Sequence, residues 1–266
     1  MKLERRTYAN GIAMTGVFEG PVRFGFTERT GGVSQSPYAS LNLGSHVGDD
    51  PAAVRENRLR VLEALGARED ADRLLVPNQV HGDHIACVQD SSPEALARVR
   101  EEIAHGADGI ICTVPHVPVM LCFADCVPVV ITSPHAVAVV HSGWKGTYAG
   151  IAGKAACMLM ELTGCAAGEL AAFVGPHILG DEYEVSEELM DRFHEHFGEV
   201  CAAGDRLLDL AACIRTSLVQ AGIAADAVCD PQLSTMKLND RFYSYRAEHG
   251  SCGRHAAVAV VGEKAR

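Results

Sequence analysis

Residues 119–144 read VMLCFADCVPVVITSPHAVAVVHSGW, three runs of apolar, largely β-branched residues in close succession. Asp125 divides the first run from the second, and Ser133-Pro134-His135 divides the second from the third. Short β-branched runs bounded by turn residues are typical of strands, and near-continuous apolarity indicates burial on both faces. We therefore expect three successive buried strands, at Val119–Phe123, Val127–Thr132 and Ala136–Val140.

The flanking sequence predicts further strands and helices on both sides of this centre. A glycine-containing loop, His141–Gly146, leads into a segment with helical spacing from Thr147 to Leu162, which Gly164 closes. Asp50-Pro51 is typical of a helix start, and the apolar face behind it stops before Gly66. The other expected helices are Ser186–Phe197 and Leu207–Ala221, and the other expected strands are Val22–Phe26, Leu74–Val80, Ile85–Val88, Ala171–Val174 and Ala256–Val261. The mixture predicts an α/β fold with helices covering the sheets, and residues 1–266 contain no linker-like or repeated segment, so we expect a single domain.

The composition argues against several functional classes. With 23 Lys plus Arg against 34 Asp plus Glu, the formal net charge is −11, which argues against a general nucleic-acid binder. The most apolar stretch, Val117–Ile131, contains Asp125 and two prolines and is too short for a membrane-spanning helix. The N-terminus has no apolar segment typical of a secretion signal, so we expect a cytoplasmic protein without a membrane partner. The ten scattered cysteines are expected to be mostly buried, reduced thiols.

Three segments each place a metal-binding side chain beside the end of an expected strand. They are Gln79–Gly82 with His81, Ala124–Cys126 with Cys126, and Val139–Trp144 with His141. Two imidazoles and one thiolate suit Zn²⁺, and three protein ligands leave the fourth tetrahedral position open, as in catalytic zinc sites. Taken singly, each residue is more often a packed cysteine or a hydrogen-bonded histidine, so spacing alone leaves both interpretations open. Asp125 is a candidate hydrogen-bond partner of a metal-ligating histidine, or a general acid or base.

Cationic side chains near glycines and aromatic residues are candidate anion-binding groups. Lys145 lies in the glycine loop that enters the predicted helix, where backbone amides can bind an anion. Arg29 precedes a pair of glycines, and Arg246 follows an aromatic segment, although surface roles are more common for arginine. The spacing of a phosphate-binding P-loop and a Gly-x-Ser-x-Gly motif are both absent, so neither a nucleotide triphosphatase nor a serine α/β-hydrolase is indicated.

Ordered blocks along nearly the whole chain resemble the laccase-domain family, also called the multicopper polyphenol oxidase or purine nucleoside phosphorylase family. In the N-terminal part the blocks are Gly25–Ser34, Pro37–Gly44, His46–Asp50 with Glu56-Asn57-Arg58, and Gln79–Gly82. In the C-terminal part they are Ala107–Gly109, Ala124–Pro128, His141–Gly146, Gly175-Pro176, Tyr183–Val185 and Phe242–Arg246.

The resemblance implies a fold, a metal site and an activity. It implies that His81, Cys126 and His141 are zinc ligands, with copper a less favoured metal. The implied fold is a layered α/β sandwich of mixed β-sheets covered by helices, similar to the deamidase domain of a bacterial cytotoxic necrotizing toxin. The implied activity is phosphate-dependent cleavage of adenosine, inosine and methylthioadenosine, with adenosine deamination as a companion reaction, so purine nucleoside and phosphate are the expected partners. The candidate catalytic residues are His81, Cys126, His141 and Asp125, and the candidate substrate contacts are Arg29, Asn42, Gln79, Lys145 and Arg246.

Two departures from the family pattern concern the candidate site. Relatives commonly have two adjacent cysteines before Tyr-Glu-Val, whereas this chain has Asp181-Glu182, so any role of those cysteines is lost here. Lys145 stands where arginine is more usual, which keeps the charge but not the two-pronged hydrogen-bonding geometry. The three candidate metal ligands are retained.

Three other functions stay open on the sequence. A copper-dependent phenol oxidase, suggested by one family name, needs more histidine ligands than a His-Cys-His set supplies. A hydrolase that edits misincorporated amino acids in peptidoglycan precursors, also attached to relatives, would use Cys126 as nucleophile and His141 as its base. A non-catalytic protein with a structural zinc is disfavoured, because three ligands leave such a site incomplete. The sequence does not determine the oligomeric state.

Overall fold

Two β-sheets lie at the centre of the computed structural model, which describes residues 2–263. In that range the first sheet has five strands in the order β1-β2-β3-β13-β6, and all neighbouring strands in it are antiparallel. The second sheet has six strands in the order β12-β9-β7-β8-β5-β4, with a parallel pair at each edge and antiparallel pairs between them. The predicted α/β class is therefore confirmed, and only the second sheet is mixed among the sheets of the described residues.

The strands of the first sheet are β1 (Glu4–Thr7), β2 (Ala13–Val17), β3 (Val22–Thr27), β6 (Val119–Phe123) and β13 (His255–Val261). Those of the second sheet are β4 (Ile85–Val88), β5 (Gly109–Cys112), β7 (Val127–Thr132), β8 (Val137–Ser142), β9 (Ala171–Val174) and β12 (Val228–Cys229), and a small hairpin consists of β10 (Ala202–Gly204) and β11 (Leu207–Leu208). The α-helices are α1 (Pro51–Ala64), α2 (Pro93–His105), α3 (Trp144–Tyr148), α4 (Ile151–Thr163), α5 (Glu187–Phe197) and α6 (Leu210–Gln220). Short 3₁₀ turns lie at Arg68–Arg73, Ala167–Glu169, Gly198–Cys201 and Ala225–Ala227.

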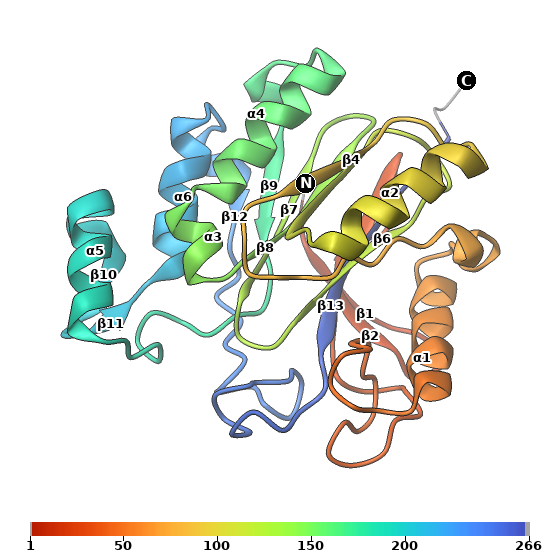
Figure 1. Ribbon diagram of the computed structural model, residues 1–266, viewed down its shortest axis with the longest axis horizontal. Coiled ribbons are helices and arrows are strands. Elements are labelled where there is room, and N and C mark those ends of the chain that lie inside the picture. The colour runs from red at the N-terminus through yellow and green to blue at the C-terminus, as the bar shows by residue number, and fades with distance from the viewer. Residues whose placement is uncertain (1, 264–266) are drawn as a thin grey trace.

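The two sheets pack face to face, and helices cover their outer faces (Figure 1). Between the sheets, Phe24 and Phe123 of the first meet Val130 and Phe173 of the second. The helix α1 packs on the outer face of the first sheet through residues such as Leu62. The helices α4 and α6 pack on the outer face of the second sheet. Alternate residues of β7 enter the two cores on either side of it, which explains why the strand is apolar throughout.

The three central strands predicted from residues 119–144 are confirmed as β6, β7 and β8. The first of them belongs to one sheet and the other two belong to the second sheet. The chain therefore passes from sheet to sheet within Ala124-Asp125-Cys126, and Asp125 takes a left-handed backbone angle, φ 87°, to make this turn. The crossing places residues of this short link at the junction of the two sheets.

Local differences from the predicted elements have simple causes. The helix predicted over Thr147–Leu162 is two helices, because Gly150 between α3 and α4 has φ 72°, a left-handed conformation that an α-helix cannot contain. The strand predicted at Leu74–Val80 was wrong: within this stretch Leu75 makes one β-bridge, to Val119, and Pro77 cannot donate to a ladder.

Further predictions concern the helix α6, the cysteines and the membrane. The segment Leu207-Leu208 is the strand β11, and α6 begins later because Asp209 caps it by accepting a hydrogen bond from the amide of Ala212. The ten cysteines are free thiols, as predicted, but only five of them are buried, while four are half-buried and one is exposed. Across residues 2–263, no helix combines the length and apolarity that crossing a bilayer requires.

Candidate active site

Three loops and strand ends bring His81, Cys126 and His141 together. His81 follows the irregular stretch before β4 and has φ 59°, Cys126 precedes β7, and His141 lies near the end of β8. One ligand atom from each residue lies within 4.8 Å of the others. The two imidazole rings are nearly perpendicular, with centroids 4.8 Å apart. The fold thus assembles the His-Cys-His set that the sequence could only suggest.

Asp108, the residue directly before β5, holds two of these three ligands in place. Its buried carboxylate accepts a hydrogen bond from His141 Nδ1 at 2.7 Å and from the backbone amides of His81 at 3.0 Å and Gly82 at 2.6 Å. Burial opposes ionisation of Asp108, but His141 and the backbone amides outweigh burial and lower the pKa of its carboxyl. Asp108 was not predicted as a site residue, although a carboxylate directly before a fully apolar strand needs partners, which was a usable signal.

The thiol of Cys126 and the imidazole of His141 stabilise each other's charge. Burial opposes the charged form of both groups, but the imidazoles of His141 and His81 outweigh it and lower the pKa of Cys126. In turn, the Cys126 thiolate and the Asp108 carboxylate raise the pKa of His141. The thiolate is therefore the favoured form of Cys126, and it is the form in which cysteine binds metals or acts as a nucleophile.

The donor set fits a metal ion of intermediate softness. Asp108 engages Nδ1 of His141, which leaves Nε2 as the nitrogen available to a ligand. Two imidazole nitrogens and one thiolate sulfur make three ligands, so a tetrahedral ion would keep one position for a substrate or water. The three residues line a cavity.

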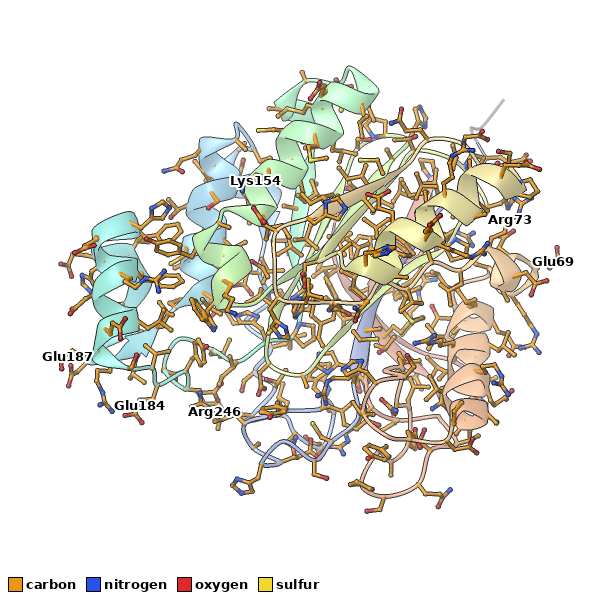
Figure 2. The ribbon with its side chains drawn as sticks, in the orientation of Figure 1. Glu69, Arg73, Lys154, Glu184, Glu187 and Arg246 are labelled. Carbon is orange, nitrogen blue, oxygen red and sulfur yellow. The ribbon has the colours of Figure 1, made fainter. Side chains whose placement is uncertain are left out.

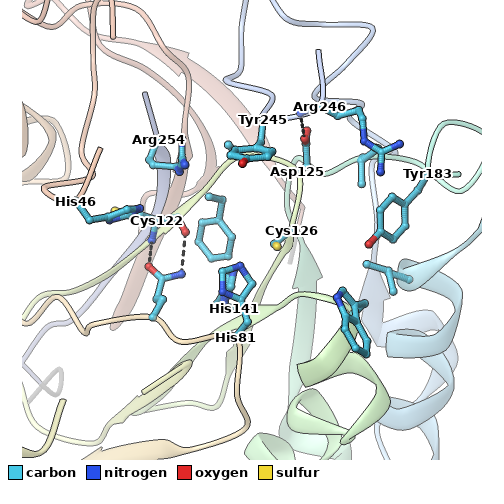
Figure 3. A pocket seen from close by; sticks show the side chains of 16 residues that line it. His46, His81, Cys122, Asp125, Cys126, His141, Tyr183, Tyr245, Arg246 and Arg254 are labelled. Atoms are coloured by element: carbon cyan, nitrogen blue, oxygen red, sulfur yellow. Dashed lines mark hydrogen bonds between the residues drawn. The ribbon is translucent and has the colours of Figure 1, made fainter. Parts of the chain in front are cut away.

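The cavity has a volume of about 480 Å³ and contains the three candidate ligands in its wall (Figure 3). Phe123, Trp144, Ile178 and Leu210 supply apolar surface. The polar groups include Gln79, Asp125, Tyr183, Arg246, His46 and Arg254. A mostly apolar hollow of this size with a few polar groups is typical of a small-molecule site.

Asp125 lines the cavity. The prediction that it bonds to a metal-ligating histidine was wrong, because its carboxylate has other partners. One oxygen of its carboxylate accepts a hydrogen bond from the Thr235 hydroxyl at 2.6 Å, and the other accepts one from the backbone amide of Arg246 at 2.7 Å. The left-handed turn at Asp125 directs its side chain toward these groups, and Asp108 is the partner of His141 instead. Asp125 therefore fixes the segment that carries Arg246.

Two of the five candidate substrate contacts, Gln79 and Arg246, line the cavity. The Gln79 side chain both donates to and accepts from the backbone of Cys122 in β6, at 2.8 and 2.7 Å. The guanidinium of Arg246 lies over the ring of Tyr183, 5.4 Å from its centroid, and reaches the carbonyl of Glu184. Arg246 lies beside Glu184 at the edge of the molecule (Figure 2).

The other three candidates, Arg29, Asn42 and Lys145, lie outside the cavity lining. Arg29 forms an ion pair with Glu248 at 3.1 Å and stacks on Tyr243, so its charge is already neutralised by a carboxylate. Lys145 is exposed, with its amino group 5.5 Å from the ring centroid of Trp144.

Asn42 is buried and acts on the cavity through Arg254. Its side-chain oxygen accepts hydrogen bonds from the backbone amides of Gly44 and Arg254, at 3.1 and 2.9 Å. His46, Tyr183 and Arg254 line the cavity and were not predicted as site residues. For His46 and Tyr183 the signal was their place in the blocks that carry the family resemblance, whereas Arg254 had no local signal.

Asp181-Glu182, which replaces the cysteine pair of relatives, forms a structural contact. The Glu182 carboxylate accepts from the backbone amide of Leu179 at 3.0 Å and from the hydroxyl of Ser234 at 2.8 Å. Lys237 pairs with Asp181 at 2.7 Å. These bonds hold the turn before Tyr183 to the loop that carries Thr235, so this chain ties the cavity wall with ion pairs and hydrogen bonds.

Comparison with known proteins places the chain in a family. The family model described as multi-copper polyphenol oxidoreductase laccase matches residues 23–262. A purine nucleoside phosphorylase of Corynebacterium glutamicum is 33% identical over 250 residues, covering 92% of this chain and 96% of the relative, and one of Deinococcus radiodurans is 37% identical over 239 residues, covering 88% and 87%. The crystal structure of YlmD from Geobacillus stearothermophilus superposes with a TM-score of 0.85 at 29% identity, covering 97% of this chain and 99% of that one. The chain therefore belongs to the multi-copper polyphenol oxidoreductase laccase family, together with relatives named purine nucleoside phosphorylases.

Proposed function

We propose that this protein is a zinc-dependent purine nucleoside phosphorylase. Its substrates are adenosine, inosine and methylthioadenosine, and adenosine deamination is a companion activity of the same cavity. The observation that carries the proposal is the three-ligand cluster open to a largely apolar cavity of about 480 Å³. The names of the relatives support the choice of reaction.

In this proposal His81, Cys126 and His141 hold the zinc ion. When bound, zinc supplies a Lewis acid at the wall of the cavity. Asp108 fixes the tautomer and the orientation of His141, and it holds the loop of His81 by its amides. The three ligands and the Asp108 hydrogen bonds that orient two of them are therefore those of a preorganised metal site.

The nucleoside base is held by the apolar and aromatic side of the cavity. Trp144 and Tyr183 offer ring faces, and Ile178 and Leu210 extend the apolar surface. Arg246 stacks on Tyr183 and presents its charge at the rim. A flat, largely apolar purine with polar edges fits this combination better than an extended polar chain does.

Phosphorolysis forms a bond between a phosphate oxygen and the ribose anomeric carbon and breaks the bond from that carbon to the purine nitrogen. The purine leaves with the electron pair of the broken bond and needs a proton or a hydrogen-bond donor. The Tyr183 hydroxyl points into the cavity (Figure 3). Burial and then the negative charge of Cys126 raise the pKa of Tyr183, so this hydroxyl keeps its proton and is available as the donor.

The test is chromatography of adenosine, inosine and methylthioadenosine incubated with the zinc-loaded protein, with and without inorganic phosphate. We expect free base and the sugar 1-phosphate only when phosphate is present. Cys126→Ala should abolish the reaction, and Cys157→Ala, which changes an exposed cysteine, should retain it. Intact nucleosides after incubation with folded, zinc-loaded protein and phosphate would overturn the proposal.

A second candidate function is favoured by the Cys126, His141 and Asp108 arrangement. A thiolate next to an imidazole that a carboxylate orients is also the arrangement of cysteine hydrolases. Such an enzyme would cleave amide bonds of peptidoglycan precursors, with Cys126 as nucleophile and His141 as proton carrier.

Alkylation with iodoacetamide, read by mass spectrometry, distinguishes the two roles of Cys126. As a zinc ligand, Cys126 is protected until a chelator removes the metal, while Cys157 reacts throughout as the internal reference. As a nucleophile, Cys126 reacts in the metal-free protein, which then hydrolyses precursors and loses that activity on alkylation.

A further inference from the structure

The cavity has two cationic ends that differ in their surroundings (Figure 3). Arg246 and Tyr183 form one end, where Asp125 accepts from the backbone of Arg246 and the Arg246 guanidinium reaches the Glu184 carbonyl. Arg254 and His46 form the other end, on the opposite side of the metal-ligand cluster.

The positive charge at the Arg254 end is not neutralised by an ion pair. Among residues 2–263, neither Arg254 nor its neighbour Arg58 forms a salt bridge with a carboxylate. Arg254 uses one terminal nitrogen, Nη1, to donate to the carbonyls of Cys252 and Gly253, both at 2.9 Å. Its Nε and its second terminal nitrogen remain as donors for a ligand, in the forked geometry that suits an oxyanion.

The arginine is held in position by buried backbone contacts. Its amide donates to the Asn42 side chain at 2.9 Å, and its carbonyl accepts from the amide of Leu43 at 3.0 Å. Gly44 fits between Arg254 and His46: a Cβ atom there would lie 2.8 Å from Arg254 Cγ and 3.4 Å from the His46 ring. Asn42 and Gly44 are thus used to bring an arginine and a histidine to one corner of the cavity.

A second cavity of about 410 Å³ meets the first at this corner. The two share His46, Gln79 and Cys122, and Arg58 lines the second one. Arg58 donates through Nε and Nη2 to the carbonyl of Leu43, so it braces the same segment that Arg254 contacts. Partial desolvation and then the positive charges of neighbours, first among them Arg254, lower the pKa of His46. Both cavities therefore present positive potential at their junction, in a chain of net charge −11.

We infer that Arg254 and His46, supported by Arg58, form the subsite for the inorganic phosphate that attacks the nucleoside. The inference deepens the proposed phosphorylase function and rests on it for the identity of the anion as co-substrate. Placing phosphate here leaves the Tyr183 end of the cavity for the base. The attacking phosphate and the leaving base then lie on opposite sides of the ribose. The side chains that bind phosphate are then distinct from Arg29 and Lys145, which lie outside the cavity lining.

The test compares Arg254→Gln, Arg254→Lys, His46→Gln and Arg246→Gln, with Arg98→Gln as an exposed control on α2. In the zinc-loaded protein, we expect Arg254→Gln to raise the KM for phosphate about tenfold or more and to leave the KM for adenosine within about twofold. Arg254→Lys should give a smaller rise, because it keeps the charge without the fork. His46→Gln should also raise the KM for phosphate, whereas Arg246→Gln should raise the KM for adenosine instead. Circular dichroism establishes that each variant is folded.

Calorimetric titration of inorganic phosphate without nucleoside separates this inference from the proposed function. If wild type binds phosphate and Arg254→Gln binds it about tenfold more weakly, the subsite stands even where no nucleoside is cleaved. If both bind phosphate equally, phosphate does not use Arg254 and the inference is overturned, whether or not the enzyme is a phosphorylase. Adenosine 5′-monophosphate is the second probe: Arg254-dependent binding of this nucleotide, with phosphate binding unaffected, would assign the corner to a substrate phosphate group and overturn the co-substrate role.

Discussion

Asp108 is the residue that links the separate parts of the metal site. Its carboxylate bonds to the ring of His141 and to the amides of the His81 loop, so one buried group positions two ligands from different parts of the chain. Its own amide donates to the carbonyl of His84, and its carbonyl accepts from the amide of His141. The three side-chain bonds depend on a carboxylate that accepts at both of its oxygens, whereas the two backbone bonds do not depend on the side chain.

We predict that Asp108→Asn lowers the affinity for zinc by about 10–100-fold, because an amide cannot accept at both oxygen positions or fix the His141 tautomer. Competition with a fluorescent chelator measures this affinity. Asp83→Asn, which changes an exposed carboxylate paired with Lys154, is the matched control and should bind zinc as wild type does. Wild-type affinity in folded Asp108→Asn would show that these bonds do not orient the ligands.

We predict that Tyr183→Phe lowers the kcat of phosphorolysis by about 100-fold and changes the KM for nucleoside little, since the ring remains and only the donor is lost. Steady-state kinetics with adenosine and phosphate measures both constants. Tyr148→Phe removes a hydroxyl outside the cavity lining and serves as the control. An unchanged kcat would mean that another group protonates the leaving base.

Residue chemistry allowed part of this site to be predicted. His81, Cys126 and His141 stood out because each is a strong metal ligand at a strand end, and the family resemblance grouped them. Asp108 and Arg254 were missed because an acid or an arginine near a strand is common, and their roles depend on contacts with residues 33 and 212 positions away.

At the scale of elements, turn chemistry explains where the secondary structure begins and ends. Asp50, Ser92 and Ser186 cap α1, α2 and α5 by accepting hydrogen bonds from amides of the first turn. One difference from the predicted helices is Gly150, whose left-handed backbone separates α3 from α4. This break lets α3 carry Trp144 to the cavity while α4 packs on the second sheet.

We predict that Gly150→Ala destabilises the protein by about 1 kcal/mol, because an alanine at φ 72° pays the strain of the left-handed region. The space around Gly150 is open, so steric overlap adds nothing to this cost. Gly168→Ala is the control: its surroundings are also open, and it has no positive φ. Urea unfolding measures both variants, and a Gly150→Ala as stable as wild type would show that α3 and α4 tolerate a continuous helix.

At the scale of the whole molecule, Glu28 joins three distant parts of the chain. This buried carboxylate, just after β3, bonds to Arg5 in β1 at 2.6 Å and to Arg241 near the C-terminal end at 2.6 Å. Burial opposes its ionisation, but the two guanidinium groups outweigh burial and lower the pKa of Glu28. The first sheet and the loop that precedes the cavity residues Tyr245 and Arg246 are therefore tied by one charge.

We predict that Glu28→Gln lowers the free energy of unfolding at pH 7 by about 2 kcal/mol, since it removes charge-assisted hydrogen bonds. Because the folded-state pKa of Glu28 is lowered, its contribution is fully present above the unfolded pKa of about 4.3 and is lost as the pH falls through the folded-state pKa. The difference between variant and wild type should therefore shrink in acid. Denaturant titrations from pH 7 to pH 3 measure it. The control is Glu56→Gln, which removes the half-exposed ion pair of Glu56 with Arg60 on α1. A difference independent of pH would contradict this role of the Glu28 charge.

The sequence alone determined most of the helices and strands, the α/β class and the identities of the three metal-ligand candidates. Periodicity, caps and turn residues act over a few positions, so they can be read locally. The tertiary structure decided that β6 and β7 lie in different sheets, that Asp108 is the partner of His141, and that Asn42 brings Arg254 beside His46. These contacts join residues far apart in the chain, and their geometry follows from how the two sheets pack, which no local pattern of residues encodes.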